Sequence, residues 1–239
     1  MESILLKFAG PLQSFGSTSH FETRQTDKYP TKSAVIGMIA ASLGLSRDDN
    51  ERLNALNDLD FAVRIDQPGR VIRDYHIAEK KKKNGQIERT YVTNRFYIED
   101  AVFVVGISNE NAQLMDEIFQ ALQRPYYQQS LGRKALVPTA DMLIGKYDTG
   151  VMDALSVLPW QAAEWYQGKK QVATIPLTIH CDSHLVGKKP TNTRKDVALS
   201  FSKDKREFTF RSESKVIIEV ENPSSEWVEH DVFSFLGGE

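Results

Sequence analysis

Apolar and polar positions along the first half of the chain follow two periods, which together predict an order of strands and helices. Residues 3–8 are apolar enough for a buried strand, and Gly10-Pro11 ends it because proline cannot donate to a ladder. Between residues 31 and 44, apolar side chains recur at helical spacing and Gly44 supplies a stop. The chain therefore starts with a strand followed by a helix.

The same two periods continue as far as residue 147. They predict a short helix ending near Leu56, a strand over 60–65, a strong central strand over 99–107, a helix that ends before Pro125, and a strand over 141–147. In order, the main elements are βαββαβ, the ferredoxin-like arrangement of many RNA-binding domains. We therefore predict an α+β protein whose residues 1–158 form a ferredoxin-like (RRM-like) domain.

An insertion at residues 70–98 interrupts this pattern with two β-prone arms. The arms meet at Asn84-Gly85, and Asn-Gly between such arms is the strongest short-range signal for a hairpin. Four consecutive lysines, residues 80–83, precede the turn. We predict a long hairpin with a lysine-rich tip that projects from the sheet.

The remaining residues predict a second, smaller unit. A helical stretch over 149–158 leads to Pro159-Trp160, which resembles a linker. Strand patterns follow at residues 172–180, 208–211 and 216–220. We predict a small C-terminal β-rich domain over residues 159–239.

Composition narrows the class of protein. The chain has 239 residues, of which 41% are hydrophobic and 26% charged, as in ordinary globular proteins. Its single cysteine, Cys181, excludes an internal disulfide and a multi-cysteine zinc site. No apolar run reaches the roughly 20 residues of a membrane helix, and the N-terminus lacks the features of a signal peptide. We expect a cytoplasmic protein with no membrane partner.

The charge of the chain is unevenly distributed. The net charge is only −2, yet residues 69–95 hold eight basic and three acidic residues, and residues 188–215 hold nine basic and four acidic ones. This split favours one side that faces a polyanion and another that faces protein neighbours. The alternative, two solvated basic loops, remains open.

The chain offers few residues for metal or acid–base chemistry. His180, Cys181 and His184 are close in sequence, but a soft-metal site needs three or four ligands, so we expect no metal and no cofactor. Metal-independent RNA cleavage needs a base and an acid. The residues eligible by type are His20, Tyr29, Lys32 and His76. Sequence does not show whether they converge or are scattered.

The start of the first helix is a candidate phosphate seat. Its first N–H groups lack partners and carry positive partial charge, so hydroxyls and a lysine there suit an anion. A plain N-cap is the alternative reading. Cationic, hydroxyl and aromatic groups precede it, as at single-stranded RNA sites. The candidate RNA-binding residues here are Arg24, Thr26, Tyr29, Thr31, Lys32 and Ser33.

Two further basic segments supply candidates for RNA binding. The hairpin contributes Arg73, His76, Lys80, Lys81, Lys82, Lys83 and Arg89. A tight Leu-Gly turn places Arg133 and Lys134 side by side. Cations at these positions suit phosphate contacts.

Several motifs carry a family resemblance. The segments GPLQSFG, TRQTDKYPTKSAVIGMIAASLGLSRDD, RDYH, YYQQSLGRKALVPT and FTFR resemble the CasD family in the same order, from Ile4 to about Arg211. This is the type I-E CRISPR-associated subunit that caps the 5′ end of the guide RNA in the Cascade complex. Phe15 stands where the family pattern has tryptophan.

The resemblance implies a ferredoxin-like body, a projecting thumb hairpin at residues 70–98 and a small C-terminal β domain. The thumb and body would hold the 5′ handle of the CRISPR RNA and contact the backbone and large subunits of Cascade, which meets target DNA. From residue type and spacing we expect Gln13 to Gly16 to form a loop beside the start of the first helix, where backbone donors, Phe15 and Lys32 would give the handle a floor.

The resemblance also bears on catalysis. In type I-E systems a separate endonuclease matures the guide, so this chain is expected to be a non-catalytic RNA-binding subunit. The alternative is a metal-independent endoribonuclease of repeat RNA, as in the related type I-C subunit. A lysine-histidine pair beside a tyrosine would favour that alternative, and the sequence contains no Lys-His dipeptide.

Overall fold

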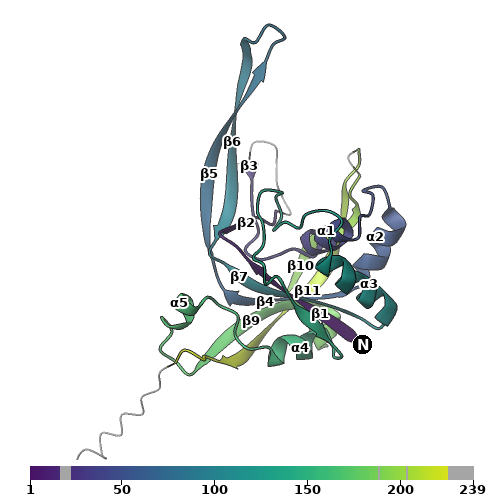
Figure 1. The fold of residues 1–239 in the computed structure, drawn as a ribbon, viewed down its shortest axis with the longest axis vertical. Helices are drawn as coiled ribbons and strands as arrows, with labels where there is room; N and C mark the ends of the chain where they lie inside the picture. Colours follow the sequence, from purple (N-terminus) through teal and green to yellow (C-terminus); the bar gives the residue numbers. More distant parts are fainter. Residues whose placement is uncertain (17–22, 188, 203, 226–239) are drawn as a thin grey trace, which may run out of the picture.

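A computed structural model describes residues 1–16, 23–187, 189–202 and 204–225 of the chain. Its fold is a mixed α+β arrangement dominated by sheet (Figure 1). The helices are α1 (Lys32–Ser42), α2 (Asn50–Asn57), α3 (Ala112–Gln123), α4 (Val151–Val157) and α5 (Glu164–Gln167), with a short 3-10 helix η1 (Ser183–Val186). The strands of the main sheet are β1 (Glu2–Ala9), β4 (Asp60–Gln67), β7 (Val102–Asn109), β8 (Leu143–Tyr147), β9 (Thr174–Asp182), β10 (Asn192–Ser200) and β11 (Glu207–Glu221).

The main sheet is seven-stranded, with the order β10-β11-β9-β4-β7-β1-β8. Every neighbouring pair is antiparallel. Its last four strands in this order, β4-β7-β1-β8, are those expected before residue 158. Strands β9 to β11 extend the same sheet through the pairing of β9 with β4. The predicted domain boundary between residues 158 and 159 thus lies in the connection between α4 and β9. The sheet hydrogen bonds between β4 and β9 join the residues before this boundary to those after it.

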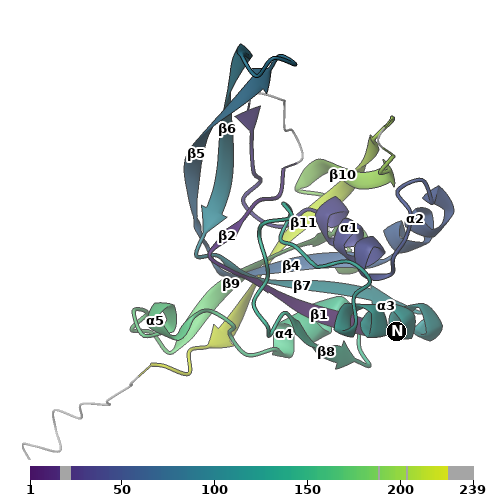
Figure 2. The same cartoon turned by 45° about the horizontal axis from the view of Figure 1, so that its top comes forward.

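Helices cover both faces of this sheet, and alternate residues of each strand point to opposite faces. On one face, Ile36 of α1 and Met115 of α3 lie in a core with Leu6 of β1. On the other face, Leu155 of α4 packs with Leu5. Figure 2 shows α1, α2 and α3 together on one side of the sheet. Because helices cover both faces, residues of both parities in β1 and β7 are buried, which explains why these strands are apolar along almost their whole length.

The predicted hairpin is confirmed as β5 (Arg70–Lys81) and β6 (Ile87–Glu99), which pair antiparallel and project away from the body (Figure 1). We call residues 70–99 the thumb hairpin. Gly85 in its turn has a φ of 83°, a backbone conformation that glycine adopts without steric cost. At its base, β2 (Leu12–Gln13) and β3 (Thr23–Arg24) pair with β6. The hairpin is thereby anchored to the segment that precedes α1.

The C-terminal strands differ from the prediction in two ways. The two strands expected at 208–211 and 216–220 form one continuous strand, β11. Strand β10 was not predicted, because its basic and acidic residues read as a solvated loop. In the structure Asp196 of β10 is fully buried and is paired by Arg211 of β11. Ionic partners from a neighbouring strand therefore replace the apolar pattern on which the prediction relied.

The described residues contain no helix that is both long and apolar enough to cross a membrane.

Candidate nucleic-acid interface

Three arginines gather at the base of the thumb hairpin. Arg24 of β3 and Arg95 of β6 are register partners in a parallel pair, so their side chains leave the same face. The guanidinium carbon of Arg133 lies 4.3 Å from the centroid of the Tyr97 ring. Its Nη2 donates to the carbonyl oxygen of Arg24 at 3.1 Å. We call Arg24, Arg95, Arg133 and Tyr97 the arginine surface.

Two of these guanidinium groups retain unused donors. The Nε of Arg95 and the Nη1 of Arg133 are buried and have no hydrogen-bond partner in the described part of the chain. A buried donor without a partner costs about 1–3 kcal/mol, so a ligand whose binding brings an acceptor within reach of these atoms would be stabilised. The planar guanidinium fork matches phosphate oxygens in particular. The arginine surface is therefore suited to a phosphodiester backbone.

The face that carries Arg95 continues along the thumb hairpin. Asp74 is opposite Arg95 and His76 is opposite Thr93. His76 Nε2 contacts the carboxylate of Asp74 on its own strand. Beyond it, Lys80 is opposite Arg89, so these two cations lie on the same face as Arg95. Arg73 projects from the opposite face, because neighbouring residues of a strand alternate.

The predicted lysines of the hairpin tip are exposed. Lys80 pairs with Glu88 at 2.9 Å, and residues 81–83 are also exposed. The guanidinium of Arg89 lies 4.9 Å from the centroid of the Tyr91 ring. Lys134 is exposed next to the half-buried Arg133. All of these cations are accessible to a polyanion.

The interpretation of Lys32 as a phosphate-binding side chain is wrong. Its Nζ is buried and donates to the carbonyl oxygen of Leu59 at 2.7 Å and to Asp182 at 3.2 Å. The backbone N–H of Lys32 donates to the carboxylate of Asp196 at 3.0 Å. A protein carboxylate therefore occupies the start of α1, where an anion was expected. Thr31 is a plain N-cap that accepts from the N–H of Ala34 at 3.2 Å.

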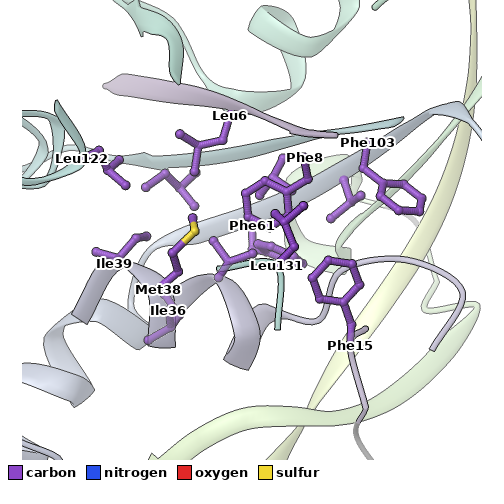
Figure 3. Close-up of a cluster of buried hydrophobic side chains, with 14 of the residues drawn as sticks. Leu6, Phe8, Phe15, Ile36, Met38, Ile39, Phe61, Phe103, Leu122 and Leu131 are labelled. Carbon is purple, nitrogen blue, oxygen red and sulfur yellow. The ribbon is translucent and has the colours of Figure 1, made fainter. Parts of the chain in front are cut away.

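The prediction that the side chains of Gln13 and Phe15 contact the handle is also wrong, because both are in the interior. Gln13 Nε2 donates to the carbonyl oxygens of Phe8 and Ala101 at 3.1 and 2.8 Å. Phe15 is 1% exposed and stacks on Phe8 with the ring centroids 6.1 Å apart. Figure 3 shows Phe15 among the core side chains beneath β1 and β7. These side chains hold residues 13–15 against the core and do not face a ligand.

The other predicted residues before α1 mainly support the fold. Thr26 Oγ1 accepts from the N–H of Phe15 at 2.9 Å, and Ser33 Oγ lies 3.3 Å from the hydroxyl of Thr31. Tyr29 stacks on His180 at 4.1 Å and its hydroxyl donates to Glu213 at 2.8 Å. Burial raises the pKa of Tyr29 to about 12, so its hydroxyl stays protonated. Of the residues named in this segment, Arg24 keeps an exposed side chain.

A buried ionic network lies behind this segment. The guanidinium of Arg211 contacts Asp182 at 3.1 Å, Asp196 at 2.8 Å and Glu213 at 2.9 Å. Burial raises the pKa of Glu213, but the contact with His180 Nδ1 at 3.4 Å and the charge of Arg211 outweigh burial and lower it to about 2. The network joins α1, β9, β10 and β11.

This network predicts a loss of stability in acid. The pKa of Glu213 is about 2 in the folded chain, against a usual value of 4.5, so its contribution is complete above pH 4.5 and is lost as the pH falls toward 2. We expect Glu213→Gln to flatten the fall of melting temperature across this window. The matched control is Glu219→Gln, which removes an exposed carboxylate from the same strand. Equal pH slopes for wild type and Glu213→Gln would contradict the assignment.

The residues eligible for RNA cleavage have different partners. Tyr29 bonds to Glu213, Lys32 to Asp182, and His76 to Asp74 of the thumb hairpin. His20 lies outside the described residues. No described contact joins these side chains to one another.

The histidines near Cys181 do not converge with it. His180 and Cys181 are neighbours on β9 and point to opposite faces; burial raises the pKa of the Cys181 thiol to about 11. His184 Nε2 lies 2.7 Å from Asp60. The described residues contain no cluster of three or more potential metal-ligating side chains.

Sequence reasoning missed Arg95 and Tyr97. Both are on β6, where residues 91, 93, 95 and 97 share the face that carries the arginine surface. Extending the period-two pattern along the second arm of the hairpin would have placed them beside the predicted Arg89. The signal in the sequence was the recurrence of arginine and tyrosine at alternate positions of this arm.

Comparison with known proteins supports one family. Residues 3–212 match the family described as CRISPR-associated protein (Cas_Cas5). The chain is 33% identical over 156 residues to the CRISPR system Cascade subunit CasD of Escherichia coli (strain K12), covering 59% of this chain and 70% of that protein.

Two solved structures are also similar. A chain of a CRISPR RNA-guided surveillance complex has a TM-score of 0.76 and 31% identity, over 92% of this chain and 91% of its own. A crystal structure of a Cas protein has a TM-score of 0.65 and 26% identity, over 93% and 99% of the two chains. The chain therefore belongs to the Cas_Cas5 family of CRISPR-associated proteins.

Proposed function

We propose that this chain is a non-catalytic RNA-binding subunit of a type I-E CRISPR Cascade complex, and that it holds the 5′ handle of the CRISPR RNA. The observation that carries the proposal is the arginine surface. It combines unused guanidinium donors of Arg95 and Arg133 with a tyrosine that supports one of them. Phosphates fit the donors, and splayed bases stack on aromatic or guanidinium planes.

The basic face of the thumb hairpin extends this surface. Single-stranded RNA leaving Arg24 and Arg95 would meet His76, Lys80 and Arg89 along one face of β5 and β6 before it reaches the other lysines of the tip. Phosphate contacts along such a path position the strand, and bases stacked at the arginine surface would supply the preference for the handle. This arrangement suits a subunit that holds a constant end of every guide.

The fold and the relatives support the remaining parts of the proposal. The strand order β4-β7-β1-β8, with α1 and α3 on one face, suits a ferredoxin-like body. The similarity to CasD and to a surveillance-complex chain supports backbone and large subunits as neighbours, with target DNA met through the complex. We place this complex in the cytoplasm.

The proposal predicts binding without cleavage. We would incubate the purified chain with labelled CRISPR repeat RNA in EDTA and resolve retarded complexes and cleavage products on parallel gels. A retarded band with intact RNA is expected. A scrambled RNA of equal length is the control for handle specificity.

Two other results would contradict the proposal. A single discrete cut would make the chain a metal-independent endoribonuclease, and His20, Tyr29, Lys32 and His76 would be replaced in turn. Equal retardation of handle and scrambled RNA would leave only non-specific polyanion binding.

A further inference from the structure

A half-exposed tryptophan occupies the connection between α4 and β9. Trp165 is in α5 and is 52% exposed. In Figure 1, α5 lies below the base of the thumb hairpin, apart from α1, α2 and α3. An exposed tryptophan is a frequent centre of protein–protein interfaces, because it buries a large apolar area when a partner covers it.

The backbone around Trp165 is held by buried hydrogen bonds. Trp160 Nε1 donates to the carbonyl oxygen of Asp66 at 2.8 Å. Gln167 Nε2 donates to the carbonyl oxygen of Trp160 at 3.2 Å, and Asn222 Nδ2 donates to that of Lys170 at 2.6 Å. These bonds fix both ends of the segment. A partner therefore meets a surface that is already ordered, which lowers the entropic cost of binding.

A cleft of about 290 Å³ separates α5 from the base of the thumb hairpin. Trp165 and Tyr166 line one wall, and Pro68, Arg70 and Asp100 line the other. The cleft thus joins an aromatic wall to a polar wall from a different part of the chain.

The unpaired charge on the cleft lining is negative. Arg70 is neutralised by Glu99, with Nε and Oε1 2.6 Å apart. The exposed carboxylate of Asp100 has no hydrogen bond or ion pair with any described residue. The indole of Trp165 accepts a cation, because Lys169 Nζ lies 4.7 Å from its ring centroid. Lys169 is not part of the cleft lining, so a cation that enters the cleft would stack on the ring face that Lys169 leaves open and would find the carboxylate of Asp100.

We propose that this cleft is a docking site for another protein subunit, which inserts an arginine side chain between Trp165 and Asp100. A guanidinium stacks on an indole and pairs with a carboxylate at the same time, so arginine fits better than lysine. Nucleic acid fits poorly, because its phosphates would meet Asp100. The docking site rests on the proposed function in one respect: its partner is another subunit of the Cascade complex.

The first test is cross-linking within the assembled complex. We would place benzoylphenylalanine at Pro68, which lines the cleft and leaves Trp165 and Asp100 intact, and irradiate the purified complex with its guide RNA. A cross-link to a protein segment that contains arginine is expected. A cross-link to RNA or DNA, or none at all, would overturn the proposal.

The second test measures the affinity of the cross-linked subunit for variants of this chain. Trp165→Ala and Asp100→Asn are each expected to raise its dissociation constant, by about 30-fold for the tryptophan. Asparagine is chosen at residue 100 because it tolerates the positive φ of 54° found there. Val157→Ala, at a 76% exposed residue of α4 outside the cleft lining, should leave the constant unchanged.

Handle-RNA binding by the isolated variants separates this proposal from the proposed function. Neither Trp165 nor Asp100 belongs to the arginine surface, so both variants should bind handle RNA as wild type does. Unchanged subunit affinity in both variants would overturn the docking site even if RNA binding is confirmed. Loss of subunit affinity with normal RNA binding would support it.

Discussion

Replacing Asp66 with alanine is expected to destabilise the chain by about 3–5 kcal/mol, because it leaves a buried guanidinium without its counter-ion. Arg64 and Asp66 are both fully enclosed, and two hydrogen bonds of 2.7 Å join them. Burial raises the pKa of Asp66, and the hydrogen bonds and charge of Arg64 oppose that rise. Each of the two buried charges is therefore tolerated only while the other is present.

The pair also fixes the chain that follows α4. Arg64 Nη1 donates to the carbonyl oxygens of Leu155 and Leu158, each at 2.6 Å. Asp66 Oδ2 accepts from the N–H of Gln161 at 2.7 Å. Loss of Asp66 therefore removes a hydrogen bond to the segment that contains Trp165. It also leaves the buried charge of Arg64 without a counter-ion.

The measurement is urea unfolding of wild type and variants. Asp148→Ala, which removes an exposed carboxylate, is the control and should change the unfolding free energy by less than about 0.5 kcal/mol. The double variant Arg64→Met/Asp66→Leu should lose less than the two single variants combined, since no buried charge remains. A loss below about 1 kcal/mol for Asp66→Ala would contradict the role assigned to the pair.

Local signals in the sequence were sufficient for the thumb hairpin and the apolar strands. Asn84-Gly85 fixes a tight turn whatever surrounds it, and the continuous apolar run in β7 requires burial on both faces. Such features depend on neighbours within a few residues. They could therefore be derived without knowledge of the tertiary structure.

The environment of individual polar residues could not be derived in the same way. Lys32 at a helix start is compatible with binding a phosphate or an internal carboxylate, and its partner Asp182 is 150 residues away. Arg64 and Asp66 likewise look like exposed residues of a strand, and only the packing of the segment after α4 buries them. The pattern of charged residues in a sequence shows that these side chains need partners of opposite charge. It does not identify whether those partners are residues of the same chain or a ligand.

The candidate site was consequently predicted in part. Cations of the thumb hairpin and the Arg133 turn are accessible, whereas the floor assigned to Phe15 is core. The error followed from reading an aromatic residue in a loop as a stacking platform. Phe15 precedes an exposed glycine, which is typical of a surface loop, but its ring packs against Phe8 and Phe103 in the core.

Replacing Arg133 with alanine is expected to weaken handle-RNA binding by about 10- to 100-fold, the effect of losing one or two charge-assisted hydrogen bonds. Arg133→Lys should recover only part of this loss, because lysine keeps the charge but lacks the planar fork. Arg95→Ala should weaken binding similarly. Under the proposed function each variant removes a phosphate contact, so the plot of log affinity against log salt should also become shallower, by about 0.7 per contact.

The controls separate binding from folding. Arg133 also bonds to the backbone of Arg24 and Phe96, so its alanine variant needs a melting curve, whereas Arg95 Nε has no such bond. Arg47→Ala removes the same charge from an exposed position between α1 and α2 and should leave both affinity and salt slope unchanged. If Arg95→Ala and Arg133→Ala match Arg47→Ala, the arginine surface does not hold the RNA. If both lose affinity while they melt like wild type, the guanidinium groups of Arg95 and Arg133 contact the RNA.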